Sequence, residues 1–232
     1  MKTYPIEFEI AGPMAMFARP DTGASPVSSP VPPWSVCKAW CESVAALFGT
    51  HRPSAFFSPT AVELWQPIRY ERYKVNYRGP LRKPEAVQQG TSYQLAATVL
   101  VDVCYRVRAE CIPLSTDQSN VNAAHALQEI FNRRLSRGQS KYTPSLGWQE
   151  FVPSYFGKLR EVGNEPSSPK LQTNVDLLLP ALLLSVWDAP VRGKYQPTFR
   201  ELAIRGGVLN FPKARVVDNI LRFAEPEPTH AG

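Results

Sequence analysis

The chain has 232 residues, of which 44% are hydrophobic, and it contains 23 prolines and 13 glycines. This length suits one large domain, or a domain with a smaller appendage, and so many prolines and glycines argue against a helical bundle. The formal net charge of +6 favours a polyanionic partner. The most apolar stretch, 175–187, has about half of the ~20 residues that a membrane span needs, and Pro180 interrupts it. Since the N-terminus lacks a continuous apolar run, we expect a cytoplasmic protein with no membrane partner.

The cysteines and histidines do not follow the spacing of a metal site. Cys37 and Cys41 fall on a predicted helix, Cys104 and Cys111 fall on opposite faces of a predicted strand, and the histidines are scattered. A structural zinc site needs four ligands in recognisable clusters. We therefore expect four reduced, buried thiols, no metal site and no cofactor.

Hydrophobic periodicity predicts the first three elements. Every second residue from Tyr4 to Ile10 is apolar, which is typical of a half-buried strand. Residues 20–33 are rich in proline, glycine and serine and predict a loop. Apolar residues then recur at helical spacing from Ser35, which can cap a helix, as far as Gly49. The chain therefore opens as strand, long loop and helix.

The next predicted elements complete a first β-α-β unit and add a second. The pattern predicts strands over 61–70 and about 99–110, a helix over about 120–137, and a strand over 146–152. The resulting order, β-α-β followed by β-α-β, predicts an α+β fold: a ferredoxin-like domain, in the form of a modified RNA-recognition motif, over residues 1–152.

The remaining residues, 153–224, predict a β-rich C-terminal appendage. The apolar run 175–187 predicts a buried segment, and 207–211 predicts a last strand. The proline-rich tail, 225–232, predicts disorder.

A basic, tyrosine-rich segment between two predicted strands is the strongest functional signal. Cations and tyrosines interleave in it: Arg69, Tyr70, Arg72, Tyr73, Lys74, Tyr77, Arg78, Arg82 and Lys83. Cationic side chains can neutralise phosphates while aromatic rings stack on bases. The segment predicts a projecting hairpin over about 70–95 that binds RNA. The alternative is a solvated hairpin whose tyrosines pack on its own surface.

Two further groups of residues leave alternatives open. Arg133, Arg134, Arg137 and Lys141 gather at the end of the second predicted helix, where they either contact a phosphate backbone or form a solvated helix terminus. His125 on the same helix could act as a general base, although a lone helical histidine is more often a surface or packing residue. Another set, Arg106 and Arg108 on the central strand, predicts surface ion pairs.

Several segments, in order along the chain, resemble the Cas-five family of CRISPR-associated proteins, and most closely its subtype I-C variety. They are IEFEIAGPMAMFARP (6–20), VSSPVPPWSVCKAWCESVA (27–45), LVDVCYRVRAEC (100–111), EIFNRRLSRGQ (129–139), PSLGWQEF (144–151) and LAIRGGVLNFP (202–212). No single motif is decisive, but the ordered set spans nearly the whole chain.

The resemblance implies a modified RNA-recognition fold with a protruding β-hairpin thumb and a C-terminal β-rich appendage. It also implies a structural subunit of Cascade, the guide-RNA-bearing surveillance complex of type I CRISPR antiviral defence. There the subunit would bind the 5′ handle of the guide RNA and cap the backbone filament. Its partners would be the guide RNA, the backbone subunit and the large subunit, with target DNA as a further candidate.

One departure from the family bears on catalysis. The resemblance to the subtype I-C variety implies an endoribonuclease that cuts precursor guide RNA. It would use a tyrosine at the end of the first helix and a Lys-His pair entering the second. The corresponding positions here are Ala45, Ala126 and Leu127, whose side chains can neither accept nor donate a proton. We therefore expect no catalytic residues and no enzymatic activity. The alternative is a metal-independent endoribonuclease with His125 as its base.

Overall fold

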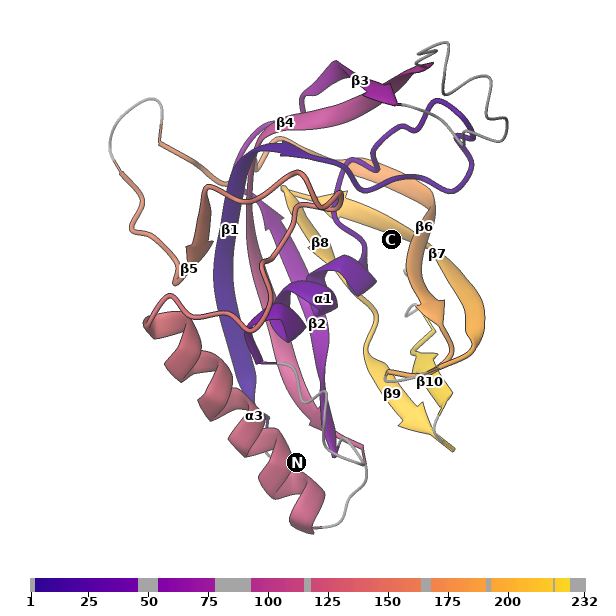
Figure 1. Ribbon diagram of the computed structural model, residues 1–232. Helices are drawn as coiled ribbons and strands as arrows, with labels where there is room; N and C mark the ends of the chain where they lie inside the picture. Colours follow the sequence, from indigo (N-terminus) through magenta and orange to yellow (C-terminus); the bar gives the residue numbers. More distant parts are fainter. Residues whose placement is uncertain are drawn as a thin grey trace, which may run out of the picture.

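The computed structural model describes residues 3–45, 54–77, 93–114, 118–163, 168–190, 193–218 and 220–225, with only the backbone at 75–77, 93–95 and 118–121. It is a mixed α/β fold with a mostly antiparallel sheet (Figure 1). The elements are β1 (Pro5–Ala15), α1 (Trp34–Ala45), β2 (Ala55–Leu64), β3 (Tyr70–Tyr77), β4 (Tyr93–Pro113), α3 (Gln118–Ser136), β5 (Tyr155–Gly157), β6 (Leu177–Trp187), β7 (Tyr195–Arg205), β8 (Val208–Asn210), β9 (Ala214–Val217) and β10 (Ile220–Phe223).

The main sheet has eight strands. Seven of them follow the order β5-β1-β4-β2-β8-β7-β6, and β3 pairs with the first part of β4. Short antiparallel ladders join β8 to both β2 and β7, so the C-terminal strands continue the N-terminal sheet. The strands β9 and β10 form a separate pair.

Helices α1 and α3 contact each other and the strands of the main sheet (Figure 1). The apolar stripe that the sequence predicts on α3 is confirmed, because all four of its residues are buried: Ala124, Leu127, Phe131 and Leu135. The Phe131 ring packs against Phe8 of β1 and Phe57 of β2, with ring centroids 5.9 and 5.5 Å apart. The predicted apolar face of β1 is confirmed in the same way, since Tyr4, Ile6, Phe8 and Ile10 are all buried.

The long strand β4 changes partners at an irregular residue. Its C-terminal part pairs with β1 and β2, whereas its N-terminal part pairs with β3 from Tyr70↔Leu100 to Tyr77↔Tyr93. At the change, Asp102 has a φ of 49°, a conformation that is uncommon outside glycine. There β4 leaves the main sheet, and the β3–β4 ladder projects from its edge (Figure 1).

Two predicted strands are wrong in their bounds. Residues 146–152 form a loop, held by backbone hydrogen bonds from Met16 N to Leu146 O and from Leu146 N to Phe151 O, and the strand comes later, at β5. Here Leu146 and Phe151 are buried without a ladder, because Gly147 has a φ of 94° and turns the chain, whereas Val152 is exposed. The strand predicted over 61–70 is β2 at 55–64, which passes through Pro59 at a β-bulge.

The apolar run near the C-terminus is only partly buried. It forms β6, an edge strand of the main sheet, and the predicted last strand is confirmed as β8. Three large side chains of β6 are exposed, namely Leu177, Leu178 and Trp187. The expectation of a buried segment is therefore wrong for these residues, since β6 is the edge strand of the extension formed by β8, β7 and β6.

The sheet face opposite α1 and α3 carries a buried ionic cluster that the sequence does not reveal. Glu9 of β1 is 2% exposed, and its carboxylate accepts hydrogen bonds from Arg106 Nε (3.0 Å), Arg160 Nε (2.5 Å) and the Arg160 backbone N–H (3.2 Å). The Arg106 guanidinium also lies 3.4 Å from the centroid of the Trp65 ring. The cluster ties the segment after β5 to the sheet.

The four cysteines are buried, as predicted, and no disulfide joins them. Within the described part of the chain, no helix is long and apolar enough to cross a membrane.

Candidate functional site

The cations that were predicted to bind RNA on the hairpin lie along β3. Arg72 and Lys74 are exposed. Arg69 is also exposed, and its guanidinium forms an ion pair with Asp102 (2.6 Å). This ion pair lies at the residue where β4 changes partners. The side chain of Tyr77, and Arg78 with the rest of the predicted hairpin tip, lie outside the described residues.

The two described tyrosines of β3 differ in their surroundings. Tyr70 is 43% exposed, and its hydroxyl donates to the carbonyl oxygen of Ser28 (3.4 Å). Burial raises the pKa of the Tyr70 phenol, so it remains a neutral hydrogen-bond donor. Tyr73 is half-buried and packs edge-on against Phe151 and Trp148, with ring centroids 5.3 and 6.4 Å away. Only Tyr70 presents much of its ring to a ligand.

The second predicted group lies at the C-terminal end of α3. Arg133 and Arg137 are exposed, whereas Arg134 is half-buried and donates from Nη1 to the carbonyl oxygen of Val44 at the end of α1 (2.8 Å). Arg134 therefore caps a helix terminus in addition to carrying a charge.

His125 lies on the same helix, eight and twelve residues before the exposed arginines. Its side chain is 55% exposed, and Nε2 lies 3.9 Å from Glu129 Oε1, one turn further along. Because residues four apart share a helix face, His125, Glu129 and Arg133 follow one exposed, slowly turning stripe, and Arg137 lies in the turn after the helix ends at Ser136. A titratable group, a carboxylate that can orient it and a cation thus follow one another along α3.

A groove runs beside this stripe. Arg133 and Glu129 of α3 line one side, and Lys158, after β5, lines the other, with Glu7 of β1 also contributing. Lys158 is exposed, and sequence analysis did not single it out, because nothing in its local pattern brings it near α3. Among the described residues, no group of three or more His, Cys, Asp or Glu side chains is placed to hold a metal ion.

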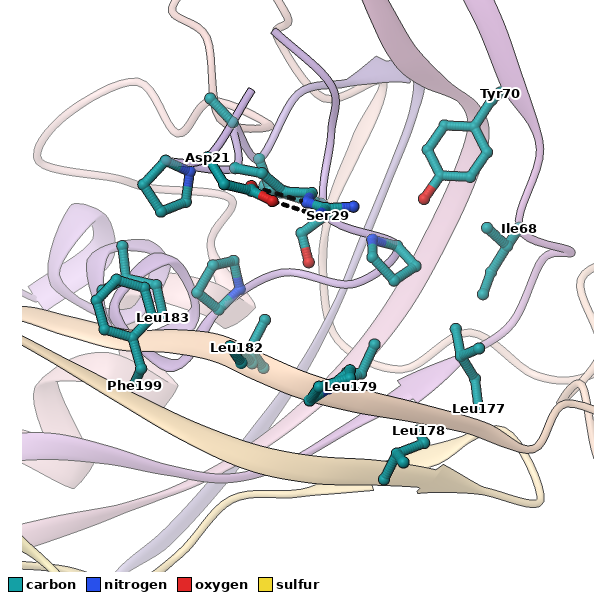
Figure 2. A pocket seen from close by; sticks show the side chains of 18 residues that line it. Asp21, Ser29, Ile68, Tyr70, Leu177, Leu178, Leu179, Leu182, Leu183 and Phe199 are labelled. Carbon is teal, nitrogen blue, oxygen red and sulfur yellow. Dashed lines mark hydrogen bonds and ion pairs between the residues drawn. The ribbon is translucent and has the colours of Figure 1, made fainter. Parts of the chain in front are cut away.

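An apolar pocket lies on another part of the surface, between the loop after β1, the start of β3 and the edge strand β6 (Figure 2). Its floor consists of residues 177–183 of β6 with Phe199 of β7, and Ile68 and Tyr70 form another wall. Arg19 and Asp21 form an exposed ion pair at its rim (2.5 Å). Sequence analysis predicted only Tyr70 as a functional residue among these.

The two predicted groups of RNA-binding residues do not form one cluster. The strand β3 and the helix α3 lie at opposite ends of the molecule (Figure 1). The positions expected to lack catalytic side chains also differ from one another. Ala45 and Leu127 are buried, whereas Ala126 is exposed on α3 next to His125.

Comparisons with known proteins agree on one family. The family model described as CRISPR-associated protein (Cas_Cas5), of the Cas5d type, matches residues 6–195. A protein of Thermus thermophilus named CRISPR pre-crRNA endoribonuclease Cas5d is 30% identical over 224 residues, which covers 89% of this chain and 91% of the relative. A protein of the same name from Mannheimia succiniciproducens is 25% identical over 222 residues, covering 89% of this chain and 94% of the relative.

The fold is shared with a solved structure. A solved structure titled as that of a CRISPR-associated protein superposes with a TM-score of 0.64 over 96% of this chain and 98% of the other, at 16% identity. This chain belongs to the Cas5 family of CRISPR-associated proteins, in its Cas5d form. The resemblance to the Cas-five family is thereby confirmed.

The expectation that the chain is not an enzyme is contradicted. Both relatives are named pre-crRNA endoribonucleases, so the family to which the chain belongs includes enzymes. The expectation depended on finding Ala45, Ala126 and Leu127 at three positions of an ungapped alignment. Such an alignment cannot place a helical residue to within one position, and His125 is exposed one residue before Ala126.

Proposed function

We propose that this protein binds precursor guide RNA, cleaves it within the repeat and keeps the resulting 5′ handle as a subunit of Cascade. The observation that carries the proposal is the exposed stripe on α3, in which His125 is followed by Glu129 and Arg133 on one helix face, with Arg137 in the turn directly after the helix. The endoribonuclease names of two full-length relatives support the same reaction.

The cleavage needs proton transfer at two oxygen atoms. Neutral His125 removes the proton of a ribose 2′-hydroxyl, and that oxygen attacks the adjacent phosphorus. The bond from phosphorus to the 5′-oxygen breaks, and the leaving oxygen takes a proton from water or from a second acid. The products are a 2′,3′-cyclic phosphate and a 5′-hydroxyl. Glu129, 3.9 Å from His125 Nε2, can orient the ring and stabilise the imidazolium that forms.

The groove beside α3 suits the strand that must be held for this step. Arg133 and Lys158 lie on its two sides, where they can neutralise neighbouring phosphates. Glu7 and Glu129 can accept hydrogen bonds from ribose hydroxyls, which distinguish RNA from DNA. His125 lies next to Glu129, which lines the groove, so cleavage beside the groove would leave the handle free to reach the cations of β3.

The test of cleavage is incubation of the purified protein with repeat RNA in EDTA. We expect cutting at one site, and we expect His125→Ala to lower the rate by at least about 10²-fold, the usual contribution of a general base, with RNA affinity unchanged. The chain's other histidines provide matched controls, since His51→Ala and His230→Ala should retain the wild-type rate. Loss of activity in a control variant instead of His125→Ala would show that the base is elsewhere.

The structural role in Cascade rests on the cations of β3. Arg72 and Lys74 are exposed on β3, Arg69 is exposed directly before it, and Tyr70 beside them has an accessible ring. We expect the assembled complex to bind handle-containing RNA at least about tenfold more tightly than scrambled RNA, and to contain backbone and large subunits as partners. Equal affinity for the two RNAs would contradict this role.

We also propose that the N-terminal part is ferredoxin-like, with β3 and the start of β4 as the base of a thumb and 153–224 as the appendage. The sheet order β5-β1-β4-β2 supports this, since in chain order it is the 4-1-3-2 arrangement of two interleaved β-α-β units. The fourth strand, β5, begins three residues beyond the boundary expected at 152.

A further inference from the structure

The apolar pocket beside β3 has the size of a site for a small planar group. Its volume is about 490 Å³, within the range of about 300–1,000 Å³ that is usual for small-ligand sites. Leu179 and Leu182 of β6 form its floor, and Pro30 and Pro33 line it from the loop after β1. The exposed Leu178, at 56%, extends this apolar surface outward.

Polar groups enter this apolar pocket at three places. Ser29 is only 5% exposed, and Figure 2 shows its hydroxyl pointing towards the floor of the pocket. Within the described residues, no hydrogen bond of this hydroxyl is seen, so it is available to a ligand. The Tyr70 hydroxyl also points inward, and it donates to Ser28 O.

The third polar group is the Arg19 guanidinium at the rim. Asp21 accepts from its Nε (3.1 Å) and Nη2 (2.5 Å), which orients the group and leaves Nη1 for another acceptor. Arg19 and Tyr70 both line the pocket, the first from the loop after β1 and the second from the start of β3. An aromatic ring and a cation are thus both present at an apolar cavity.

We propose that this pocket binds one unpaired base of the RNA, turned out of the strand that lies along β3. The proposal rests on the proposed function, in which RNA is the ligand. The base stacks on the Tyr70 ring, its edge is hydrogen-bonded by Ser29 Oγ and its phosphate lies near Arg19. Continuity favours RNA over an apolar polypeptide, because Tyr70 adjoins two exposed cations, Arg69 directly before β3 and Arg72 on β3.

The test uses a set of single-stranded repeat RNAs, each with one abasic residue, bound to the full-length protein. For the wild type, one abasic position should weaken binding by about fivefold to a hundredfold, the usual worth of one stacked base. In Tyr70→Ala and in Ser29→Val, which places a methyl group where the hydroxyl stood, that penalty should fall to less than twofold. Tyr195→Ala, an exposed tyrosine of β7 outside the pocket, should retain the full penalty.

The outcomes separate this proposal from the one on which it rests. If the wild type binds no RNA, both are wrong. If the wild type binds RNA, but each abasic position lowers the affinity of the pocket variants as much as that of the wild type, only the pocket proposal is wrong. It is also overturned if the pocket variants keep every RNA penalty and lose a protein subunit from the assembled complex, because the pocket then receives a polypeptide.

Discussion

Replacing Glu9 by glutamine tests whether the ionic cluster behind the sheet holds the fold together. The substitution keeps the size of the side chain and one acceptor oxygen but removes the charge. Arg106, whose side chain is 14% exposed, then remains buried against Trp65 without its counter-ion. Arg160 is 43% exposed and can turn towards water, so most of the loss comes from Arg106.

Removing one partner of a buried ion pair costs about 3–5 kcal/mol, because the other charge stays uncompensated. Since Arg160 can be solvated and glutamine still accepts one hydrogen bond, we expect about 2–3 kcal/mol for Glu9→Gln, at or just below the lower end of that range. For a chain of this size, each kcal/mol lowers Tm by about 2–4 °C. The melting temperature should therefore fall by roughly 4–12 °C.

Differential scanning calorimetry or urea unfolding measures this loss, and Glu7→Gln is its matched control. Glu7 is exposed on the same strand, so neutralising it should change stability by less than about 0.5 kcal/mol. Adding Arg106→Met to Glu9→Gln should recover part of the loss, since an apolar pair can replace a buried ionic one. Equal Tm values for Glu9→Gln and Glu7→Gln would refute the reasoning.

Three further predictions concern backbone strain and buried thiols. Gly147→Ala should prevent stable folding, since a Cβ there would lie 1.8 Å from a backbone oxygen at a φ of 94°. Gly138 has open space around it, so Gly138→Ala should lower the free energy of unfolding by only about 1 kcal/mol. Circular dichroism melts distinguish the two variants. The free energy of unfolding of Asp102→Gly in urea should be within about 0.5 kcal/mol of the wild-type value, because glycine tolerates the φ of 49° and the lost ion pair is exposed. Asp102→Val should instead lower this free energy by about 1–3 kcal/mol. Burial raises the pKa of Cys104 to about 12, so its thiol should react with DTNB at pH 8 only after unfolding. The folded state holds this proton more tightly than the unfolded state does, so the stability contributed by Cys104 is present below a pH of about 8.5 and declines as the pH rises towards 12.

The cleavage proposal and the base-pocket proposal depend on different residues. His125 and the groove lie on α3, while Tyr70 and the pocket lie at the start of β3, at the other end of the molecule. A variant at one site should therefore leave the readout of the other unchanged, which allows the two experiments to be combined on one set of proteins.

Sequence reasoning located the helices and most strands because each depends on a local repeat. The stripe of α3 and the apolar face of β1 are confirmed, since a repeat of 3.6 or 2.0 decides which side chains face the core, whereas Glu9 on the other face of β1 is also buried. The strand predicted over 146–152 failed for the opposite reason. Leu146 and Phe151 are buried in a loop, and only the turn at Gly147 and the contact with Met16 show this.

The candidate site was located less well than the fold. The cations of β3 and the arginines of α3 were singled out from their clustering, and the structure places them in two separate regions. Lys158, Ser29 and Arg19 were missed, because each belongs to a loop whose composition is ordinary. They lie beside a groove or pocket because strands distant in the sequence pack next to them, and local sequence patterns do not predict such contacts.

The sequence by itself determined the mixed α/β class, the buried faces, the basic and aromatic character of β3, and the family to which the chain belongs. These follow from short-range periodicity and from ordered segments that the amino-acid order carries directly. Only the tertiary structure decided that Glu9 is buried beneath Arg106 and Arg160, which follow it by 97 and 151 residues. Contacts of that separation are set by strand pairing across the whole sheet, so the physical environment of a charged or apolar side chain is known only once the sheet has formed.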